Sequence, residues 1–307
     1  MKNITVSPLE AGQRFDKFLL KLLPSAGKGF IYKMLRKKNF TLNGVKASGS
    51  EILTSGDEVC LYISDDTYEK FTAVQSGKVS GVKLDIIYED EDILIINKPA
   101  GLLSQKAAPG DVSLCEYICE YMRQSGADDE YFRAFTPGVC NRLDRNTSGL
   151  ITAGKTLKGL QILSEGFRDR TIDKYYTAIV CGRFEAFLRH TGYAVKDAAS
   201  NKVTIHDSEV PDSEYVSTEF EPVSYNNNYT VLSVKLITGK THQIRAVLAH
   251  LGFPIAGDSK YGGKGPAKRQ LLHCSRMVFP KDFALDKVAG LTVTAPLPAD
   301  MTEFTQR

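Results

Sequence analysis

The chain has 307 residues, of which 42% are hydrophobic and 24% charged, and its formal net charge is +3. This composition supports a folded core and about two domains, but the net charge neither favours nor excludes a nucleic-acid partner. We expect no secretory signal and no membrane span, because no apolar segment has the required character or length. The six cysteines form no C-x-x-C pair, so we expect reduced thiols in a cytoplasmic protein.

The first sixty residues predict a small unit of two helices and a hairpin. Residues 13–23 carry apolar side chains at positions i, i+3, i+4 and i+7, which is one face of a helix. Residues 30–36 indicate a second short helix. Asn43-Gly44 is a strong hairpin signal, and residues 56–63 close the unit as a strand.

The same unit is unusually basic. Eight basic residues and no acidic residue lie between Lys17 and Ser50, and such an imbalance causes self-repulsion unless an anion relieves it. A solvated helix face would explain a lone lysine cluster. Here the cluster coincides with a complete helix–helix–hairpin unit, so we interpret it as a surface for RNA or DNA phosphates. Its predicted RNA contacts are Lys33, Arg36, Lys37 and Lys38.

Residues 65–83 are polar and rich in Ser-Gly steps, and we interpret them as a linker between domains at 1–64 and 84–307. The second domain alternates strands and helices irregularly, which predicts an α+β fold with a mixed sheet. Its predicted strands lie within 85–98, at 149–156, 173–182, 229–239 and 271–280, with short strands between 183 and 228. Its predicted helices lie at 112–124, at 158–167 and after residue 242.

Two patterns suggest chemistry that we do not expect here. Residues 149–156 match the phosphate-loop pattern G-x-x-x-x-G-K-[ST]. The residues between its glycines are strand-like, whereas a phosphate loop is an open loop that follows a strand. The five histidines show no H-E-x-x-H spacing and the chain has no G-x-S-x-G. We therefore predict no metal, no cofactor and no Ser-His-Asp chemistry.

The most unusual reactive group is a carboxylate between two arginines. Residues 140–150, CNRLDRNTSGL, place Asp144 between Arg142 and Arg145. The segments NRLDRNTSGL (141–150), KYYTAIVCG (174–182) and TGKTHQIRAVLAHLGFPIAGDSKYG (238–262) resemble signature segments of the RluA-type pseudouridine synthases. DILIINKPAGLL and LLHCSRMVFP fit that family in the same order.

The resemblance implies a largely antiparallel sheet of the pseudouridine synthase type and isomerisation of uridine in structured RNA. The basic N-terminal unit resembles the S-four-like RNA-binding module, the usual companion of the branch that modifies ribosomal RNA. By this resemblance we expect large-subunit ribosomal RNA as the partner, with transfer RNA as the alternative. We also expect a monomer.

The resemblance assigns Asp144 as the catalytic carboxylate. Pseudouridine formation breaks the N1–C1′ bond, turns the base and rejoins it through C5, so charge develops at the sugar beside the carboxylate. Whether Asp144 acts as a nucleophile or as a base stays open. Arg245 would pair with Asp144 and orient it. Tyr176 would stack on the target base and assist proton transfer at C5, while Tyr175 would lie on the opposite strand face.

The remaining site residues would shape the loop and hold the opened RNA. Arg142 would fill or clamp the site from which uridine is flipped, and the flanking arginines and the turn would together hold the carboxylate. The residues expected to shape the loop are Asn141, Leu143, Thr147, Ser148 and Gly149, with Gly149 allowing a tight turn. Asn141 and Ser104 stand where many relatives carry histidine, which leaves the specific RNA target open.

Two alternatives belong to other classes of protein. An RNA-binding or ribosome-assembly factor that has lost catalysis would keep the basic unit, but Asp144 and Arg245 are both present. A nucleosidase or glycosidase using Asp144 would have little need for the basic unit and would usually require a second carboxylate.

Overall fold

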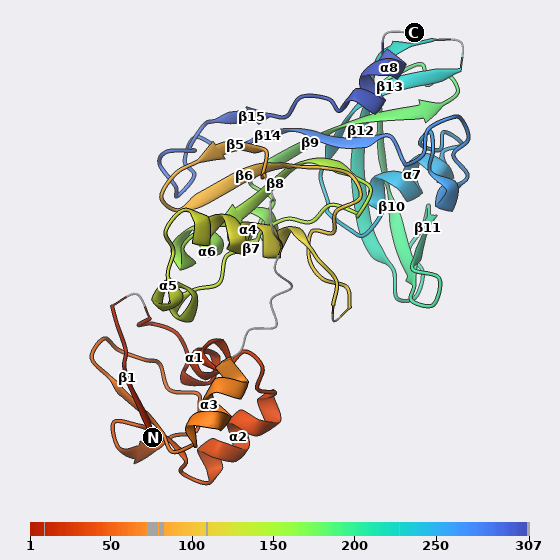
Figure 1. Cartoon of the computed structure of the whole chain (residues 1–307). Helices are drawn as coiled ribbons and strands as arrows, with labels where there is room; N and C mark the ends of the chain where they lie inside the picture. The colour runs from red at the N-terminus through yellow and green to blue at the C-terminus, as the bar shows by residue number, and fades with distance from the viewer. Residues whose placement is uncertain (9, 73–78, 80–82, 109, 227, 306–307) are drawn as a thin grey trace. The chain divides into compact units, whose positions relative to one another are not determined.

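The computed structural model describes residues 1–8, 10–72, 79, 83–108, 110–226 and 228–305 (Figure 1). Its contacts divide the chain into two compact units, residues 1–82 with 116–137 and residues 83–115 with 138–307. The grouping of 116–137 with the first unit was not predicted. It is accompanied by packing of helix α5 (Asp129–Ala134) on helix α1 (Phe15–Leu22). Within the described ranges, no helix combines the length and apolar character that crossing a membrane requires.

The N-terminal unit packs α1 and α2 (Lys28–Arg36) with a four-stranded antiparallel sheet in the order β1-β4-β2-β3. The strands are β1 (Lys2–Thr5), β2 (Phe40–Leu42), β3 (Val45–Lys46) and β4 (Glu58–Leu61). The predicted helix face is buried, with Phe15, Phe18 and Leu19 inaccessible to solvent. Asn43 and Gly44 both adopt positive φ between β2 and β3, as the hairpin signal predicted.

The predicted linker is wrong in its first part, because residues Asp65–Thr72 form helix α3. Tyr68 and Phe71 pack against the core of the N-terminal unit, and the Phe71 ring lies 4.5 Å from that of Phe30. These two aromatic side chains give the polar segment an apolar side that helical spacing brings together. Residues 73–78 and 80–82 of the predicted linker lie outside the described residues.

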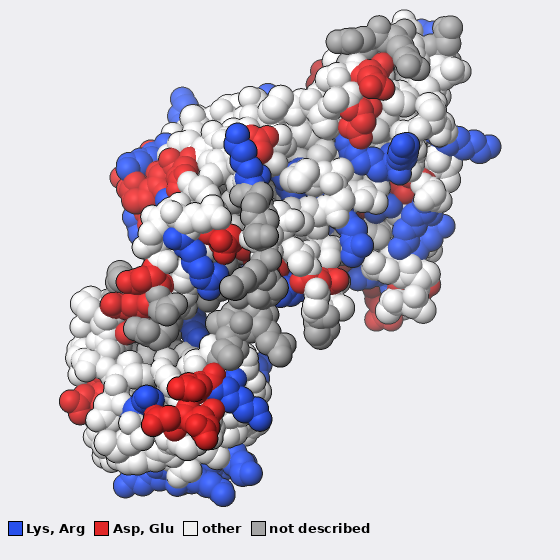
Figure 2. Space-filling view, in the orientation of Figure 1, with Lys and Arg blue, Asp and Glu red and all other residues white. Residues whose placement is uncertain are grey.

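Most of the basic cluster is exposed. The four predicted RNA contacts on or just after α2 are exposed, and lysine and arginine side chains gather along one edge of this unit in Figure 2. Lys21 is the exception. Its ammonium donates to the Gln13 side chain at 2.9 Å and to the carbonyl of Ala134 at 2.5 Å, so it is engaged in packing rather than presented to an anion.

The second unit is built on an eleven-stranded, largely antiparallel sheet, as the resemblance implied. Its path is β11-β10-β12-β13-β9-β14-β8-β6-β5, with β15 beside β14 and β7 beside β8. Among the described strands, β8 and β14 form the one parallel neighbour pair. The strands are β5 (Ile86–Glu89), β6 (Ile93–Lys98), β7 (Gly138–Val139), β8 (Ser148–Gly154), β9 (Asp173–Cys181), β10 (Leu188–Asp197), β11 (Lys202–His206), β12 (Glu214–Tyr225), β13 (Tyr229–Leu236), β14 (Leu272–Val278) and β15 (Thr292–Thr294). The helices are α4 (Leu114–Gln124), which crosses the boundary between the units, α6 (Leu157–Arg168), α7 (Gln243–His250), the short η1 (Ser259–Tyr261) and α8 (Ala299–Thr305).

The prediction of short strands between 183 and 228 is confirmed for β11, which has five residues, but wrong for the two longer strands. β10 has ten residues and β12 has twelve, and they pair with each other along much of their length. Exposed and buried side chains alternate in the middle of β10. A half-exposed strand carries polar residues at every second position, which makes a long strand look like shorter ones in the sequence.

The phosphate-loop pattern lies in a strand, as predicted, and its last residue caps a helix. All seven residues of β8 are buried. Lys155 donates to Glu89 at 2.6 Å and to the carbonyl of Asp90 at 2.7 Å, and the Thr156 hydroxyl caps α6 by accepting from the Gly159 amide. The lysine and hydroxyl that would hold phosphate are therefore structural.

Gly149 allows two strands to approach each other closely. It does not form the tight turn that was expected. Its φ is +112°, and a Cβ there would lie 2.2 Å from the carbonyl oxygen of Cys274 on β14. Only glycine allows β8 and β14 to approach this closely, directly after the Asp144 loop.

We predict that Gly149→Ala lowers the free energy of unfolding by roughly 2–4 kcal/mol, because it combines overpacking with backbone strain. Gly252→Ala is the matched control, since Gly252 also has positive φ but no atom within 4 Å of its added Cβ. The control should cost about 1 kcal/mol. Urea denaturation of both variants measures the difference, and equal losses would contradict the close-approach explanation.

Candidate active site

A cleft of about 1180 Å³ opens in the second unit around Asp144. Segments from the loop after β6, the loop before β8, α6, β9 and the residues around the start of α7 line it. Among its described lining residues, ten are lysine or arginine and one, Asp144, is acidic. The basic residues are Lys106, Arg142, Arg145, Arg168, Arg170, Lys174, Lys196, Lys240, Arg245 and Lys260. Such a cleft favours a polyanion, with a single carboxylate at its centre.

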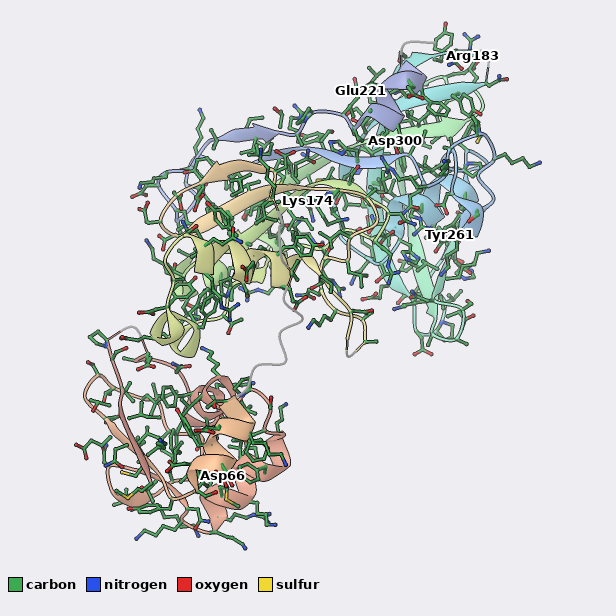
Figure 3. All side chains as sticks on the ribbon, viewed as in Figure 1. Asp66, Lys174, Arg183, Glu221, Tyr261 and Asp300 are labelled. Carbon is green, nitrogen blue, oxygen red and sulfur yellow. The ribbon has the colours of Figure 1, made fainter. Side chains whose placement is uncertain are left out.

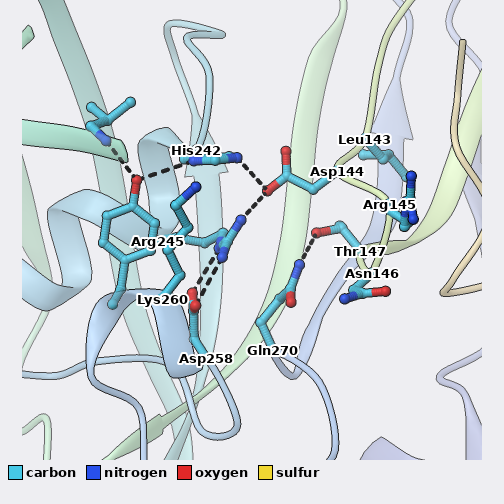
Figure 4. Close-up of polar contacts among 12 residues, drawn as sticks. Leu143, Asp144, Arg145, Asn146, Thr147, His242, Arg245, Asp258, Lys260 and Gln270 are labelled. Carbon is cyan, nitrogen blue, oxygen red and sulfur yellow. Dashed lines mark hydrogen bonds and ion pairs between the residues drawn. The ribbon is translucent and has the colours of Figure 1, made fainter. Parts of the chain in front are cut away.

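Asp144 is held by an arginine far away in the sequence. Arg245 on α7 donates from Nη1 to Oδ2 of Asp144 at 2.8 Å, and from Nε and Nη2 to both oxygens of Asp258 at 2.7 and 2.8 Å (Figure 4). The Arg245 and Asp258 side chains are 8% and 1% exposed, whereas Asp144 is 27% exposed. Burial opposes the charge of Arg245, but Asp258 and Asp144 outweigh it and raise the pKa of the guanidinium.

The flanking arginines do not hold the carboxylate, contrary to the expectation. Arg142 and Arg145 are exposed and line the cleft, and within the described structure Asp144 pairs with Arg245. Adjacent side chains on an irregular loop point in different directions, so sequence proximity misled here. The role of Arg142 in binding RNA stays a prediction, and its side chain lines the cleft.

His242 is a neighbour of Asp144 that was not predicted as a site residue. Its Nε2 lies 3.9 Å from Oδ2 of Asp144, and its Nδ1 lies 3.1 Å from the hydroxyl of Tyr261. The Tyr261 ring also lies 5.0 Å from the guanidinium carbon of Arg245. His242, Asp258 and Tyr261 all belong to the matched segment 238–262, which was the available signal.

The loop that carries Asp144 is fixed by side chains beneath it. The Ser104 hydroxyl donates to the carbonyl of Leu143 at 2.8 Å and accepts from its amide at 3.0 Å. The Thr147 amide donates to the carbonyl of Asp144 at 3.0 Å, and Gln270 donates to the Thr147 hydroxyl at 3.4 Å. Ser104 therefore holds the backbone beside Asp144.

A buried lysine and a buried asparagine complete this support. The ammonium of Lys98 donates to the carbonyls of Pro99, Leu102 and Arg145 at 2.8, 2.8 and 3.1 Å. Its burial lowers the pKa of Lys98 to about 7, although Asp144 acts in the opposite direction. The Asn141 side chain accepts from the amide of Thr152 at 2.8 Å, so it ties the loop to β8.

Ser148 lies behind the loop rather than in the cleft lining. It is 3% exposed, and its hydroxyl lies 2.9 Å from Nδ1 of His273 on β14. Arg269 donates to the carbonyl of Asn146 at 3.1 Å and pairs with Asp300 on α8 at 2.6 Å. Figure 3 shows Asp300 on that helix. These contacts hold the loop from the side of the C-terminal elements.

Tyr176 and Tyr175 face opposite sides of β9, as predicted. Tyr176 is 5% exposed and lines the cleft, and burial together with Cys274 and Asp144 raises the pKa of its hydroxyl well above its usual range. Tyr175 instead packs under Arg276, whose guanidinium carbon lies 3.8 Å from the ring centre. Tyr176 therefore presents a protonated, largely buried phenol near the carboxylate.

The predicted site residues fall in two places. Asp144, Arg245, Tyr176, Arg142 and the loop residues Asn141, Leu143 and Thr147 line the cleft, with Ser148 and Gly149 behind them. Lys33, Arg36, Lys37 and Lys38 belong to the N-terminal unit. The cations contributed by α6, β9, β10 and η1 were not predicted, because each lies alone in the sequence and only the fold brings them to one cleft.

Comparisons with known proteins give the site its context. Residues 92–250 match the family described as RNA pseudouridylate synthase. The chain is 32% identical to an RNA pseudouridine synthase of Mycoplasma genitalium over 88% of this chain and 86% of that protein. It is 31% identical to ribosomal large subunit pseudouridine synthase D of Yersinia pestis, over 98% of this chain and 92% of that protein.

A further relative and a solved structure agree. Ribosomal large subunit pseudouridine synthase C of Pasteurella multocida is 31% identical over 86% of this chain and 79% of that protein. The structure of human RNA pseudouridylate synthase domain containing 4 shares the fold, with a TM-score of 0.60, 20% identity and coverage of 72% of this chain and 91% of that one. By the family match and these full-length similarities, the chain belongs to the RNA pseudouridine synthase family.

Proposed function

We propose that the protein isomerises specific uridines in large-subunit ribosomal RNA, acting as a monomer in the cytoplasm and without a cofactor. The observation that carries the chemistry is a single carboxylate, Asp144, at the centre of a cleft lined by ten cations. Two relatives at about 31% identity are named ribosomal large subunit pseudouridine synthases, which supports the choice of RNA.

The reaction follows from what the cleft can hold. Its volume exceeds that of one nucleotide, so a flipped uridine enters with its neighbours while the cations contact phosphates. Asp144 lies beside the sugar, where it bonds to C1′ or removes a sugar proton as the N1–C1′ bond breaks. The detached base turns in place and C5 bonds to C1′. On the first route this breaks the Asp144–C1′ bond, and on the second route Asp144 returns its proton to the sugar. C5 then loses its proton to water, and N1, which kept the electron pair of the broken bond, gains a proton from water. Tyr176 stacks on the base.

The N-terminal unit supplies a second contact with RNA in this proposal. Its exposed cations Lys33, Arg36, Lys37 and Lys38 form a basic edge at the end of α2. The order of its elements, two helices followed by a hairpin, is the feature that resembles the S-four-like module. Contacts from a separate unit would select among uridines by the surrounding RNA shape, which the cleft alone senses less well.

We predict that Asp144→Asn abolishes isomerisation but leaves RNA affinity within about threefold of the wild type. The amide keeps the shape and can still accept from Arg245, but it is neither a competent nucleophile nor a base. Tritium release from RNA labelled at uridine C5 measures the reaction, and filter binding measures affinity. Wild-type release from ribosomal but not transfer RNA is expected, and the reverse would change the substrate class. If the wild type binds RNA but never releases tritium, the protein is a silent binding or assembly factor.

We predict that both basic surfaces contribute phosphate contacts. Each lost contact reduces the slope of log affinity against log salt by about 0.7–0.9, so removing four should reduce it by roughly 3. One variant replaces the N-terminal set by alanine, Lys33, Arg36, Lys37 and Lys38. A second variant replaces four cleft residues, Arg168, Arg170, Lys196 and Lys240.

The control variant removes four exposed cations that lie outside the cleft lining. These are Lys158, Arg183, Arg189 and Lys287. Each is paired with a carboxylate, as Arg168 and Lys240 of the cleft set also are. The salt slope of this control should match the wild type, measured by filter binding from about 50 to about 300 mM salt, a roughly sixfold range around physiological strength. An unchanged slope in the N-terminal variant would exclude that unit from the RNA footprint.

A further inference from the structure

We propose that His242 is a positioning residue of the reaction. Its Nε2–H, fixed by Tyr261, holds Oδ2 of Asp144 together with Arg245, and this leaves Oδ1 as the oxygen that acts on the nucleotide. The inference rests on the proposed function and assigns a role to a residue outside the Asp144–Arg245–Tyr176 set.

The tautomer of His242 follows from its partner. The Tyr261 hydroxyl accepts from the amide of Val203 at 2.8 Å and lies 3.1 Å from Nδ1 of His242 (Figure 4). With that amide occupying a lone pair, the hydroxyl satisfies its own hydrogen by donating to Nδ1. A neutral imidazole that accepts at Nδ1 carries its proton on Nε2, the nitrogen that faces Asp144.

The charges around His242 favour this neutral form. Its side chain is 9% exposed. Asp144 and Asp258 face it as carboxylates, while Arg245 and Lys260 face it as cations. Burial, with the two cations, keeps the pKa of His242 below its usual range against the pull of Asp144. The imidazole therefore offers one hydrogen-bond donor and does not add a third positive charge to those of Arg245 and Lys260.

The backbone at His242 is held in a conformation that side chains rarely adopt. Its φ is +52° and its ψ is +16°, directly before the first residue of α7. Such strain persists where the surroundings over-determine it, and it is found at functional positions. In this conformation the imidazole lies between Tyr261 and Asp144.

Arg245 and His242 both approach the same oxygen of Asp144. Arg245 Nη1 lies 2.8 Å and His242 Nε2 lies 3.9 Å from Oδ2, and no contact to Oδ1 is found among the described residues. A distance of 3.9 Å is longer than a hydrogen bond, but contacts of this kind often tighten when the substrate binds. Two donors on Oδ2 fix the carboxylate plane and direct Oδ1 into the cleft.

Two substitutions separate the nitrogen facing Asp144 from the nitrogen facing Tyr261. The amide nitrogen of His242→Gln lies near the position of Nε2, whereas that of His242→Asn lies near Nδ1. We expect His242→Asn to slow single-turnover tritium release about 100-fold, within the range for lost donors and supporting partners. We expect His242→Gln to stay within about tenfold of the wild type, and RNA affinity to change little in either.

Tyr261→Phe tests the hydrogen bond between the Tyr261 hydroxyl and the imidazole without changing His242 itself. It keeps the ring under Arg245 but removes the hydroxyl, and we expect a loss of about tenfold. Combined with His242→Gln it should add little, because Tyr261 would act through the imidazole. Melting temperatures check that all variants are folded. The pH profiles of His242→Gln and the wild type should coincide between pH 6 and 8, since His242 transfers no proton.

The outcomes are distinct. If His242→Asn releases tritium as fast as the wild type, or His242→Gln as slowly as His242→Asn, the role of Nε2–H is overturned. The proposed function would still stand. A pH limb that disappears in His242→Gln would instead make His242 an acid or base, which also overturns the proposal. A wild type that releases no tritium from any RNA removes the proposed function, and this inference with it.

Discussion

A buried arginine that needs two carboxylates is the constraint on which the site depends. Taking a guanidinium out of water is costly unless opposite charges and hydrogen bonds replace the solvent. Asp258 supplies a bidentate partner to Arg245, and Asp144 supplies the third bond. Asp258 alone can neutralise Arg245, so Arg245 holds Asp144 in position without needing its charge. The Asp144 side chain also has more solvent access than that of Asp258. The fold thus holds one carboxylate in a fixed position within a basic cleft.

The local elements of the fold could be predicted from the sequence because their signals are local. The apolar spacing around Phe15, the Asn43-Gly44 turn and the alternation at Tyr175 and Tyr176 each involve a few adjacent residues, and all correspond to the structure. Helix α3 was missed because its only apolar contacts, Tyr68 and Phe71, are diluted by polar neighbours. Strand β10 was predicted as shorter pieces because exposed residues alternate with buried ones along its middle.

The site residues could be predicted only where they lie in a segment that matches the family. Asp144 and Arg245 could be named from matched segments, and the structure brings them together. Closeness in the sequence did not identify the partner of Asp144. The adjacent arginines line the cleft, and Arg245, 101 positions away, makes the bond. The same holds for Lys98 and Ser104, whose roles depend on carbonyls that no side-chain pattern reveals.

The position of β14 has a consequence for how the enzyme is made. This strand, near the C-terminal end, lies between β8, which follows the Asp144 loop, and β9, on the half of the sheet that continues to β13. Both halves are synthesised before the strand that joins them. On a ribosome that adds about 5–20 residues per second, the two halves wait for several seconds without their shared neighbour. The sheet that carries the Asp144 loop therefore closes only after residues 272–278 have been synthesised.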